Sequence, residues 1–235
     1  MLEPAQAFNK NDMPIRDQIL RVIQVKEQTL SFRDRVSSIH DLLSARSDTP
    51  VRRAGLDLLD ARAEEIVLDI GFGGGESLVA LAKAVGPKGM VFGIELSAEM
   101  VELARKNLAK ASLLERARLR RGNAIRLPYQ NETMDAVFVS FTLEQFDTSG
   151  IQKVLHECKR VLCPGGRIVV VSVSQNTKGR SLLGVLRWAH ELLPNLPNCR
   201  PILVQPALER AGFNITTALK RPRWIPVEIT LGFKQ

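Results

Sequence analysis

From about residue 66 onward, the chain alternates short, continuous apolar runs with stretches of helical hydrophobic period. Continuous apolar runs are typical of strands buried on both faces of a parallel sheet, whereas apolar residues three and four positions apart indicate helices. The alternation predicts an α/β fold with a parallel sheet between two layers of helices. We expect strands at 66–70, 90–94, 136–141 and 168–173, and helices at 77–85, 98–110 and 151–162. Ser97 is the expected N-cap of the second helix, and Pro164-Gly165-Gly166 is expected to close the third.

Both ends of the chain depart from this alternation. Residues 1–60 have a helical pattern and precede a predicted core that spans 61–235. The core is expected to contain a helical insertion followed by a last helix and two short strands, whereas a dinucleotide-binding domain would continue with parallel units. We place the insertion at about 175–205, the last helix at 206–211 and the two last strands at 213–215 and 227–231.

The composition is that of an ordinary globular protein, with 45% hydrophobic and 25% charged residues among 235. The sequence contains no run of 18 apolar residues, so it predicts no transmembrane helix. Its first residues lack the layout of a signal peptide. The three cysteines have no metal-ligand spacing and are interpreted as reduced thiols. We therefore expect a cytoplasmic protein without a metal site.

The net charge of +8 is concentrated in the last third of the chain. Residues 151–235 contain 13 Lys and Arg against 4 Asp and Glu. Such a region attracts nucleic acid, anionic lipid or a small anionic molecule, although a solvated face that keeps the protein soluble is an equally good interpretation.

The clearest motif is a glycine-rich turn between the first predicted strand and the helix after it. Residues 69–77 are DIGFGGGES, and Glu95 ends the next predicted strand. Glycines allow a sharp turn and a close approach of the backbone to a ligand. A carboxylate at the end of the second strand can accept hydrogen bonds from both ribose hydroxyls. This arrangement predicts a site for a cofactor that contains a nucleoside.

The charges of the loop help to identify the cofactor. A dinucleotide fingerprint has a third glycine where this chain has Glu76, whose carboxylate would repel a pyrophosphate at the helix N-terminus. The lysine of a P-loop is absent as well. S-adenosylmethionine (SAM) has no phosphate, and its sulfonium and ammonium groups suit Asp69. A nucleotide-dependent oxidoreductase remains an alternative that requires Glu76 beside a pyrophosphate.

Four ordered motifs resemble the class I SAM-dependent methyltransferases, and among them the group of C-methyltransferases of ubiquinone and menaquinone biosynthesis. The resemblance covers about residues 40–174 and implies a Rossmann-like, seven-stranded, mostly parallel sheet with an antiparallel last strand. It also implies SAM as cofactor and methyl transfer as activity. The motifs are VLDIGFGGGESL, GIELSAEM, RRGNAIRLPYQNETMDAVFVSFTLEQF and VLCPGGRIVVVSVS.

The resemblance assigns roles to matched positions of this chain. Asn123 stands where the family often has Asp, and its carbonyl can still accept a hydrogen bond from the adenine amino group. Phe72-Gly73-Gly74-Gly75 replaces the usual Cys-Gly-Thr-Gly and keeps the glycines that the turn needs. The implied contacts are Asp69, Gly71, Phe72, Gly73 and Gly75 for the methionine part, Glu95 for the ribose, Leu96, Met100, Asn123 and Ala124 for the adenine, and Ser140, Phe141 and Thr142 beside the methyl group.

Methyl transfer from a sulfonium is an in-line displacement, so proximity and orientation supply much of the rate. An oxygen, carbon or thiol acceptor can also require a base. The candidates are His190, His40 with Asp41, and Glu144, although a lone histidine is more often a packed or surface residue. His40 stands where the family commonly has tyrosine.

The resemblance implies that the helical residues 1–60 form a cap over the site, that the core ends in an antiparallel hairpin, and that the acceptor binds beside the insertion. An apolar helix expected there at 181–193 is flanked by cations. This combination suits a small lipophilic or amphiphilic acceptor with anionic character, quinone-like by analogy, and peripheral contact with an anionic membrane. The alternative is an ordinary core-facing helix. The sequence carries no signal for an oligomeric state.

Two rival functions follow from other features. A cluster of five arginines within 116–126 would suit a nucleic-acid methyltransferase, but SFTLE replaces the N/D-P-P-Y/F motif of amino-methylating enzymes and aromatic residues are few. Nucleic acid is therefore an unlikely partner. A non-catalytic SAM-binding protein is the second rival, because methyltransferases carry few indispensable catalytic side chains.

Overall fold

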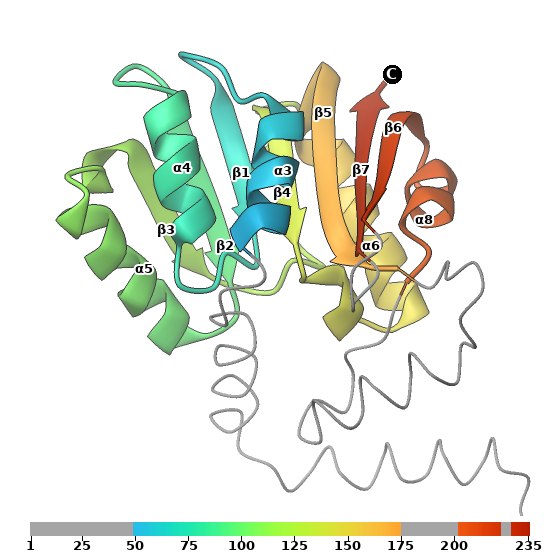
Figure 1. Cartoon of the computed structure of the whole chain (residues 1–235), viewed down its shortest axis with the longest axis horizontal. Helices are drawn as coiled ribbons and strands as arrows, with labels where there is room; N and C mark the ends of the chain where they lie inside the picture. Colours follow the sequence, from blue (N-terminus) through green and yellow to red (C-terminus); the bar gives the residue numbers. More distant parts are fainter. Residues whose placement is uncertain (1–48, 175–201, 222–226) are drawn as a thin grey trace, which may run out of the picture.

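The structure is a computed structural model that describes residues 49–174, 202–221 and 227–235. Within these ranges seven strands form one sheet in the order β3-β2-β1-β4-β5-β7-β6 (Figure 1). β1 to β5 pair in parallel, and β7 is antiparallel to both β5 and β6. The predicted fold class is confirmed. The strands are β1 (Ile66–Ile70), β2 (Met90–Glu95), β3 (Ala117–Arg121), β4 (Met134–Ser140), β5 (Leu162–Val173), β6 (Phe213–Arg221) and β7 (Val227–Lys234).

Helices cover both faces of the sheet, and on each face an apolar core lies between the sheet and its helices. One core joins α3, α4 and α5 to the sheet, and the other joins α6 and α8 to the opposite face (Figure 1). Ser97 caps α5 as predicted, because its hydroxyl accepts a hydrogen bond from the backbone N–H of Met100. The helices are α3 (Thr49–Leu59), α4 (Glu76–Ala84), α5 (Ala98–Lys110), α6 (Thr148–Val161) and α8 (Val204–Arg210), with short 3₁₀ turns η1 (Leu114–Arg116) and η2 (Leu143–Gln145).

Three elements differ from the sequence-based expectations. β3 was expected only as part of a basic cluster, yet it pairs in parallel with β2 at the edge of the sheet. Pro164-Gly165-Gly166 was expected to close the preceding helix, but it lies within β5, which begins directly after α6. β6 continues to Arg221, well beyond the predicted 213–215, because β7 pairs with it along most of its length.

α3 is the described part of the predicted N-terminal cap, and it packs against β4, β5 and β7 beside α4. Gly55 allows this close approach, since a Cβ there would lie 2.5 Å from Val171 Cγ2. Residues 1–48 and most of the insertion, 175–201, lie outside the described residues. The cap and the insertion therefore stay predictions. Within the described part of the chain, no helix is long and apolar enough to cross a membrane.

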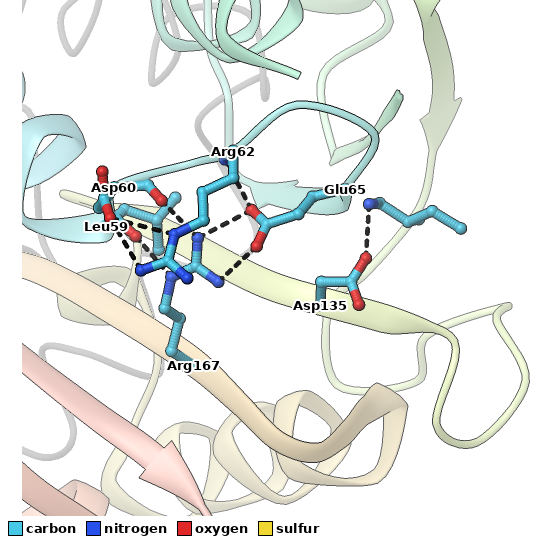
Figure 2. A network of polar contacts seen from close by, with 7 residues as sticks. Leu59, Asp60, Arg62, Glu65, Asp135 and Arg167 are labelled. Carbon is cyan, nitrogen blue, oxygen red and sulfur yellow. Dashed lines mark hydrogen bonds and ion pairs between the residues drawn. The ribbon is translucent and has the colours of Figure 1, made fainter. Parts of the chain in front are cut away.

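A polar network fixes the end of α3 to the sheet (Figure 2). Arg167, near the start of the regular part of β5, donates to both carboxylate oxygens of Glu65 at 2.9 and 2.8 Å. The same guanidinium donates to the carbonyls of Leu59 and Asp60, both at 2.6 Å. Carbonyls at the end of a helix have no partner within that helix, so Arg167 supplies the one they need. The network thereby sets the position of α3, whose other end reaches the glycine loop.

The order of the strands places a topological switch point at the carboxyl ends of β1 and β4. The chain runs outward from β1 to β2 and β3 and then returns to β4, which lies on the other side of β1. Ligands of open parallel sheets bind at such a switch point, where loops on the two sides diverge. The glycine loop and residues 140–142 both lie there, because they follow β1 and β4 directly.

Candidate functional site

The glycine loop after β1 contains three residues in the left-handed region, Gly71, Gly73 and Gly75, with φ of 69°, 51° and 86°. A Cβ on Gly71 would lie 2.2 Å from Thr142 Oγ1, and one on Gly75 would lie 2.7 Å from Ala104 Cβ. These two glycines let the loop pack against β4 and α5. No described atom lies within 4 Å of a Cβ placed on Gly73, so this residue presents its backbone to open space.

Hydrogen bonds hold the loop in this form. Gly71 N–H donates to the carbonyl of Ile94 at 2.8 Å, and the Asn107 side chain donates to the carbonyl of Gly74 at 2.9 Å. The ring of Phe72 is buried and packs where Gly93 leaves room for it. Phe72 therefore contributes backbone to the site, while its side chain belongs to the core. Contacts within the protein therefore fix the conformation of the loop, and a fixed loop reduces the entropic cost of binding a ligand.

Glu95 lies where β2 ends, directly beside the glycine loop. Its Oε2 accepts a hydrogen bond from Gly73 N–H at 3.1 Å, and its Oε1 accepts one from Ser97 N–H at 3.0 Å. The structure thus brings together the acid and the loop that the sequence singled out. Next to them Leu96 is 48% exposed, an apolar surface at the rim of the site.

Asp69 is buried beneath the loop and accepts a hydrogen bond of 2.6 Å from the hydroxyl of Ser77. Burial raises the pKa of Asp69 to about 7, against the lowering effects of the Ser77 hydrogen bond and the positive charge of Arg52. The negative charge of Glu95 raises this pKa further. Asp69 therefore changes its charge near neutral pH.

Two of the expected adenine contacts, Asn123 and Ala124, follow the end of β3, whereas Leu96 follows β2 and Met100 lies in the first turn of α5. Gly122 N–H donates to the carbonyl of Glu95 at 2.9 Å, which holds this loop beside β2. Asn123 is exposed, and its Oδ1 accepts a hydrogen bond from Ile125 N–H at 3.1 Å. A carbonyl oxygen has two lone pairs, so this oxygen can also accept a bond from a ligand. Ala124 is buried in the core. The adenine contact of Asn123 stays a prediction.

Residues 140–142 lie on the β4 side of the switch point. The hydroxyl of Thr142 lies 3.1 Å from the carbonyl of Ile70 and 3.0 Å from that of Ser140, so it ties the ends of β1 and β4 together. Phe141 has φ of 51°, a strained conformation for a residue with a side chain. Ser140 Oγ is buried without a hydrogen-bond partner among the described residues. A hydroxyl in this position can donate to a bound ligand.

The catalytic candidates are only partly described. Glu144 is buried, and its Oε1 accepts a hydrogen bond from Val173 N–H at 2.9 Å, which joins η2 to the end of β5. His190, His40 and Asp41 lie outside the described residues, so their roles as bases stay predictions. In the described part of the chain, no group of His, Cys, Asp and Glu could hold a metal ion.

Two residues of the site were missed by the sequence-based reasoning. Ser77, the hydroxyl partner of Asp69, belongs to the glycine motif and could have been found from its spacing. Arg52 comes from α3 and forms an ion pair with Glu76 at the start of α4. No sequence signal connects residues 52 and 76, because only the packing of α3 on the sheet brings them together.

Comparison with known proteins agrees with this geometry. Residues 67–166 match a family model described as a methyltransferase domain. A demethylmenaquinone methyltransferase of Lactobacillus johnsonii is 32% identical over 159 residues, 67% of this chain and 63% of that protein. Residues 67–166 thus belong to a family of methyltransferase domains. A second demethylmenaquinone methyltransferase, from Halalkalibacterium halodurans, is 33% identical over 67% of this chain and 62% of the relative. The matches thus span just under two thirds of these relatives.

Solved structures share the fold of this chain at low sequence identity. A SAM-dependent methyltransferase from Aquifex aeolicus has a TM-score of 0.64 at 22% identity, covering 84% of this chain and 98% of that one. A geranyl diphosphate methyltransferase in complex with SAM has a TM-score of 0.67 at 17% identity, covering 81% of this chain and 86% of that one.

Proposed function

We propose that this methyltransferase binds SAM and transfers its methyl group to a small, lipophilic or amphiphilic acceptor, quinone-like by analogy. The observation that carries the proposal is the acidic loop at the switch point, where Gly73 faces open space, donates a hydrogen bond to Glu95 and follows the buried Asp69 in the same loop. Glu76 begins α4 at the position where a dinucleotide fold binds a pyrophosphate. The residues present fit a cofactor that carries cationic groups and no phosphate.

In this proposal the side chains bind and orient. Glu95 accepts hydrogen bonds from the ribose hydroxyls, and the backbone of the glycine loop holds the methionine part above Asp69. Asn123 accepts from the adenine amino group. SAM supplies a methyl group on a positively charged sulfur, which is already activated toward a nucleophile. The protein then needs chiefly to hold the acceptor in line with that methyl group near the end of β4.

The nature of the acceptor has support from the relatives. Their names specify demethylmenaquinone, and the structural neighbour is named for geranyl diphosphate, so both act on lipophilic molecules. Identity of about one third supports a small-molecule acceptor without specifying it. Contact with an anionic membrane and a cytoplasmic location stay predictions, and the helix expected at 181–193 lies outside the described residues.

The activity can be tested with SAM that is labelled in its methyl group. The protein is incubated with demethylated quinones, prenyl diphosphates or a transcribed RNA, and the labelled product is identified. We expect label in a lipophilic small molecule. Label only in RNA would favour the nucleic-acid methyltransferase, and bound SAM without transfer to any acceptor would favour the non-catalytic protein.

Alanine at Gly73 tests whether the open space is the cofactor site. Gly86, in the turn after α4, is a matched control, because it also has a positive φ, of 70°, and no described atom near its Cβ position. Each change should cost about 1–2 kcal/mol of stability from the strained backbone. Only Gly73→Ala should weaken SAM binding, as measured by calorimetry. Equal SAM affinities of the two variants would place the cofactor elsewhere.

SAM binding should depend on pH through Asp69. Because the pKa of Asp69 is raised to about 7, the carboxyl is largely neutral at pH 6 and ionised at pH 8. A decrease of this pKa by about one unit on binding of the cationic cofactor would raise SAM affinity by about fivefold between pH 6 and pH 8. Asp69→Asn should remove the part of the pH dependence that Asp69 causes. The same slope in both proteins would assign the titration to another group.

The same pKa shift affects stability with a defined sign. The folded protein binds the proton of Asp69 more tightly than the unfolded chain, whose pKa is near 3.8. The contribution of Asp69 to stability is therefore fully present below about pH 4 and is lost as the pH rises through about 7.

A further inference from the structure

Arg52 is placed at the glycine loop although it belongs to a separate helix. It lies in the first turn of α3, and its guanidinium forms an ion pair with the carboxylate of Glu76. The Arg52 side chain is only 16% exposed, whereas that of Glu76 is 65% exposed. The cation is therefore held within the protein surface, while its partner lies largely in solvent.

The loop itself carries negative charge and no cation. Residues 69–77 contain Asp69 and Glu76 without any Lys or Arg, and Glu95 hydrogen-bonds to the same loop. Among the described residues, Arg52 is the recorded cationic partner of these carboxylates: it pairs with Glu76, and its charge also acts on Asp69. An anionic group that enters this loop is repelled by the carboxylates of Asp69, Glu76 and Glu95. Arg52 attracts it.

The amino-acid part of SAM brings one such anionic group, its α-carboxylate. We infer that Arg52 binds this carboxylate and that Glu76 is a competing carboxylate supplied by the chain itself. The inference rests on the proposed function and adds a residue that selects the amino-acid end of the cofactor.

The physical case depends on how weakly Glu76 holds Arg52. An ion pair with an exposed partner contributes little stability, because water and salt screen it. Glu76 is also stabilised independently, since it lies in the first turn of α4, where the helix dipole favours negative charge. The guanidinium has five donors in a planar fork and can bind a second carboxylate while it keeps or releases the first. Arg52 is therefore available to a ligand at little cost.

The test compares two ligands that differ only in the carboxylate. Decarboxylated SAM keeps the sulfonium and the amino group, so the ratio of its dissociation constant to that of SAM measures the recognition of the carboxylate. In Arg52→Gln this ratio should fall by roughly 10- to 100-fold, the value of a charge-assisted hydrogen bond to a carboxylate. In Glu76→Gln the ratio should stay or rise, because the competitor is gone.

Arg53→Gln is the matched control, since it removes the same charge from the neighbouring, exposed position of α3. Its ratio should equal that of the unchanged protein. An unchanged ratio in Arg52→Gln would overturn the inference. If the Arg52–Glu76 ion pair only joins α3 to α4, the ratio stays unchanged and both Arg52→Gln and Glu76→Gln unfold at lower midpoints. If Arg52→Gln fails to fold, Arg52→Lys keeps the charge without the fork and should give an intermediate ratio.

The outcome for the unchanged protein separates this inference from the proposed function. Binding of SAM and decarboxylated SAM with equal affinity would overturn the role of Arg52 and leave the methyltransferase proposal intact. Binding of neither ligand would overturn both.

Discussion

Replacement of Glu95 by alanine is expected to weaken SAM binding by about 1–3 kcal/mol, the cost of leaving the ribose hydroxyls without their acceptor. This corresponds to roughly 5- to 150-fold in the dissociation constant. The variant should remain folded, because Glu95 is only half-buried at the end of β2. The N–H groups that it binds, on Gly73 and Ser97, lie in the loops that follow β1 and β2, outside the core.

Calorimetric titration with SAM measures this effect, and circular dichroism checks the fold. Glu102→Ala provides the control, since it removes a carboxylate from an exposed position of the neighbouring helix α5. SAM affinity should be unchanged in that control. If Glu95→Ala bound SAM as tightly as the control does, the ribose contact would have been assigned to the wrong acid.

Replacement of Arg167 by alanine is expected to lower the free energy of unfolding by about 3–5 kcal/mol, the cost of removing one partner from a buried ion pair. The side chains of Arg167 and Glu65 are only 12% and 16% exposed. The change leaves the Glu65 carboxylate without its cation and leaves two carbonyls at the end of α3 without their donor (Figure 2). Urea denaturation gives the change in free energy.

Arg62→Ala is the control within the same network. Arg62 pairs through its side chain with Asp60, and both side chains are about 70% exposed. That substitution should cost at most about 1 kcal/mol, because exposed ion pairs contribute little. Similar losses in the two variants would contradict the role given to Arg167.

The pair also predicts a response to acid. Burial alone would raise the pKa of Glu65, but hydrogen bonds from Arg167 and from Arg62 N–H, with the charge of Arg167, hold it below its ordinary value of 4.5. The stabilisation is fully present above this ordinary value and is lost as the pH falls through the lowered pKa. Arg167→Ala should therefore lose less stability in acid than the unchanged protein does.

Local sequence signals identified most elements of the core. Continuous apolar runs predicted β1, β2 and β4 to within two residues at each end. The prediction succeeds because a strand that is buried on both faces is apolar at nearly every position. Ser97 was identified as a helix cap from its position alone. β3 escaped this reasoning because a charged edge strand shows little hydrophobic pattern, and charge at an edge protects a sheet from pairing with other chains.

The candidate site was predictable to the extent that it lies in one continuous motif. Gly71, Gly73, Asp69 and Glu95 follow from the order of strand, turn and acid, and the structure brings them together. The partners that come from other elements were not predictable from spacing. Thr142 was expected at the site only from the resemblance, and no spacing indicated its hydrogen bond to the end of β1. Arg52 reaches the loop because α3 packs on the sheet.

The most direct test of the central claim is a calorimetric titration of the protein with SAM, S-adenosylhomocysteine and NADH. The acidic loop and Glu95 predict micromolar binding of the first two ligands and no binding of NADH, because a pyrophosphate would face Glu76 at the start of α4. Binding of NADH without SAM would contradict the account and favour a nucleotide-dependent oxidoreductase. Binding of none of the three would leave the fold standing and remove the cofactor assignment.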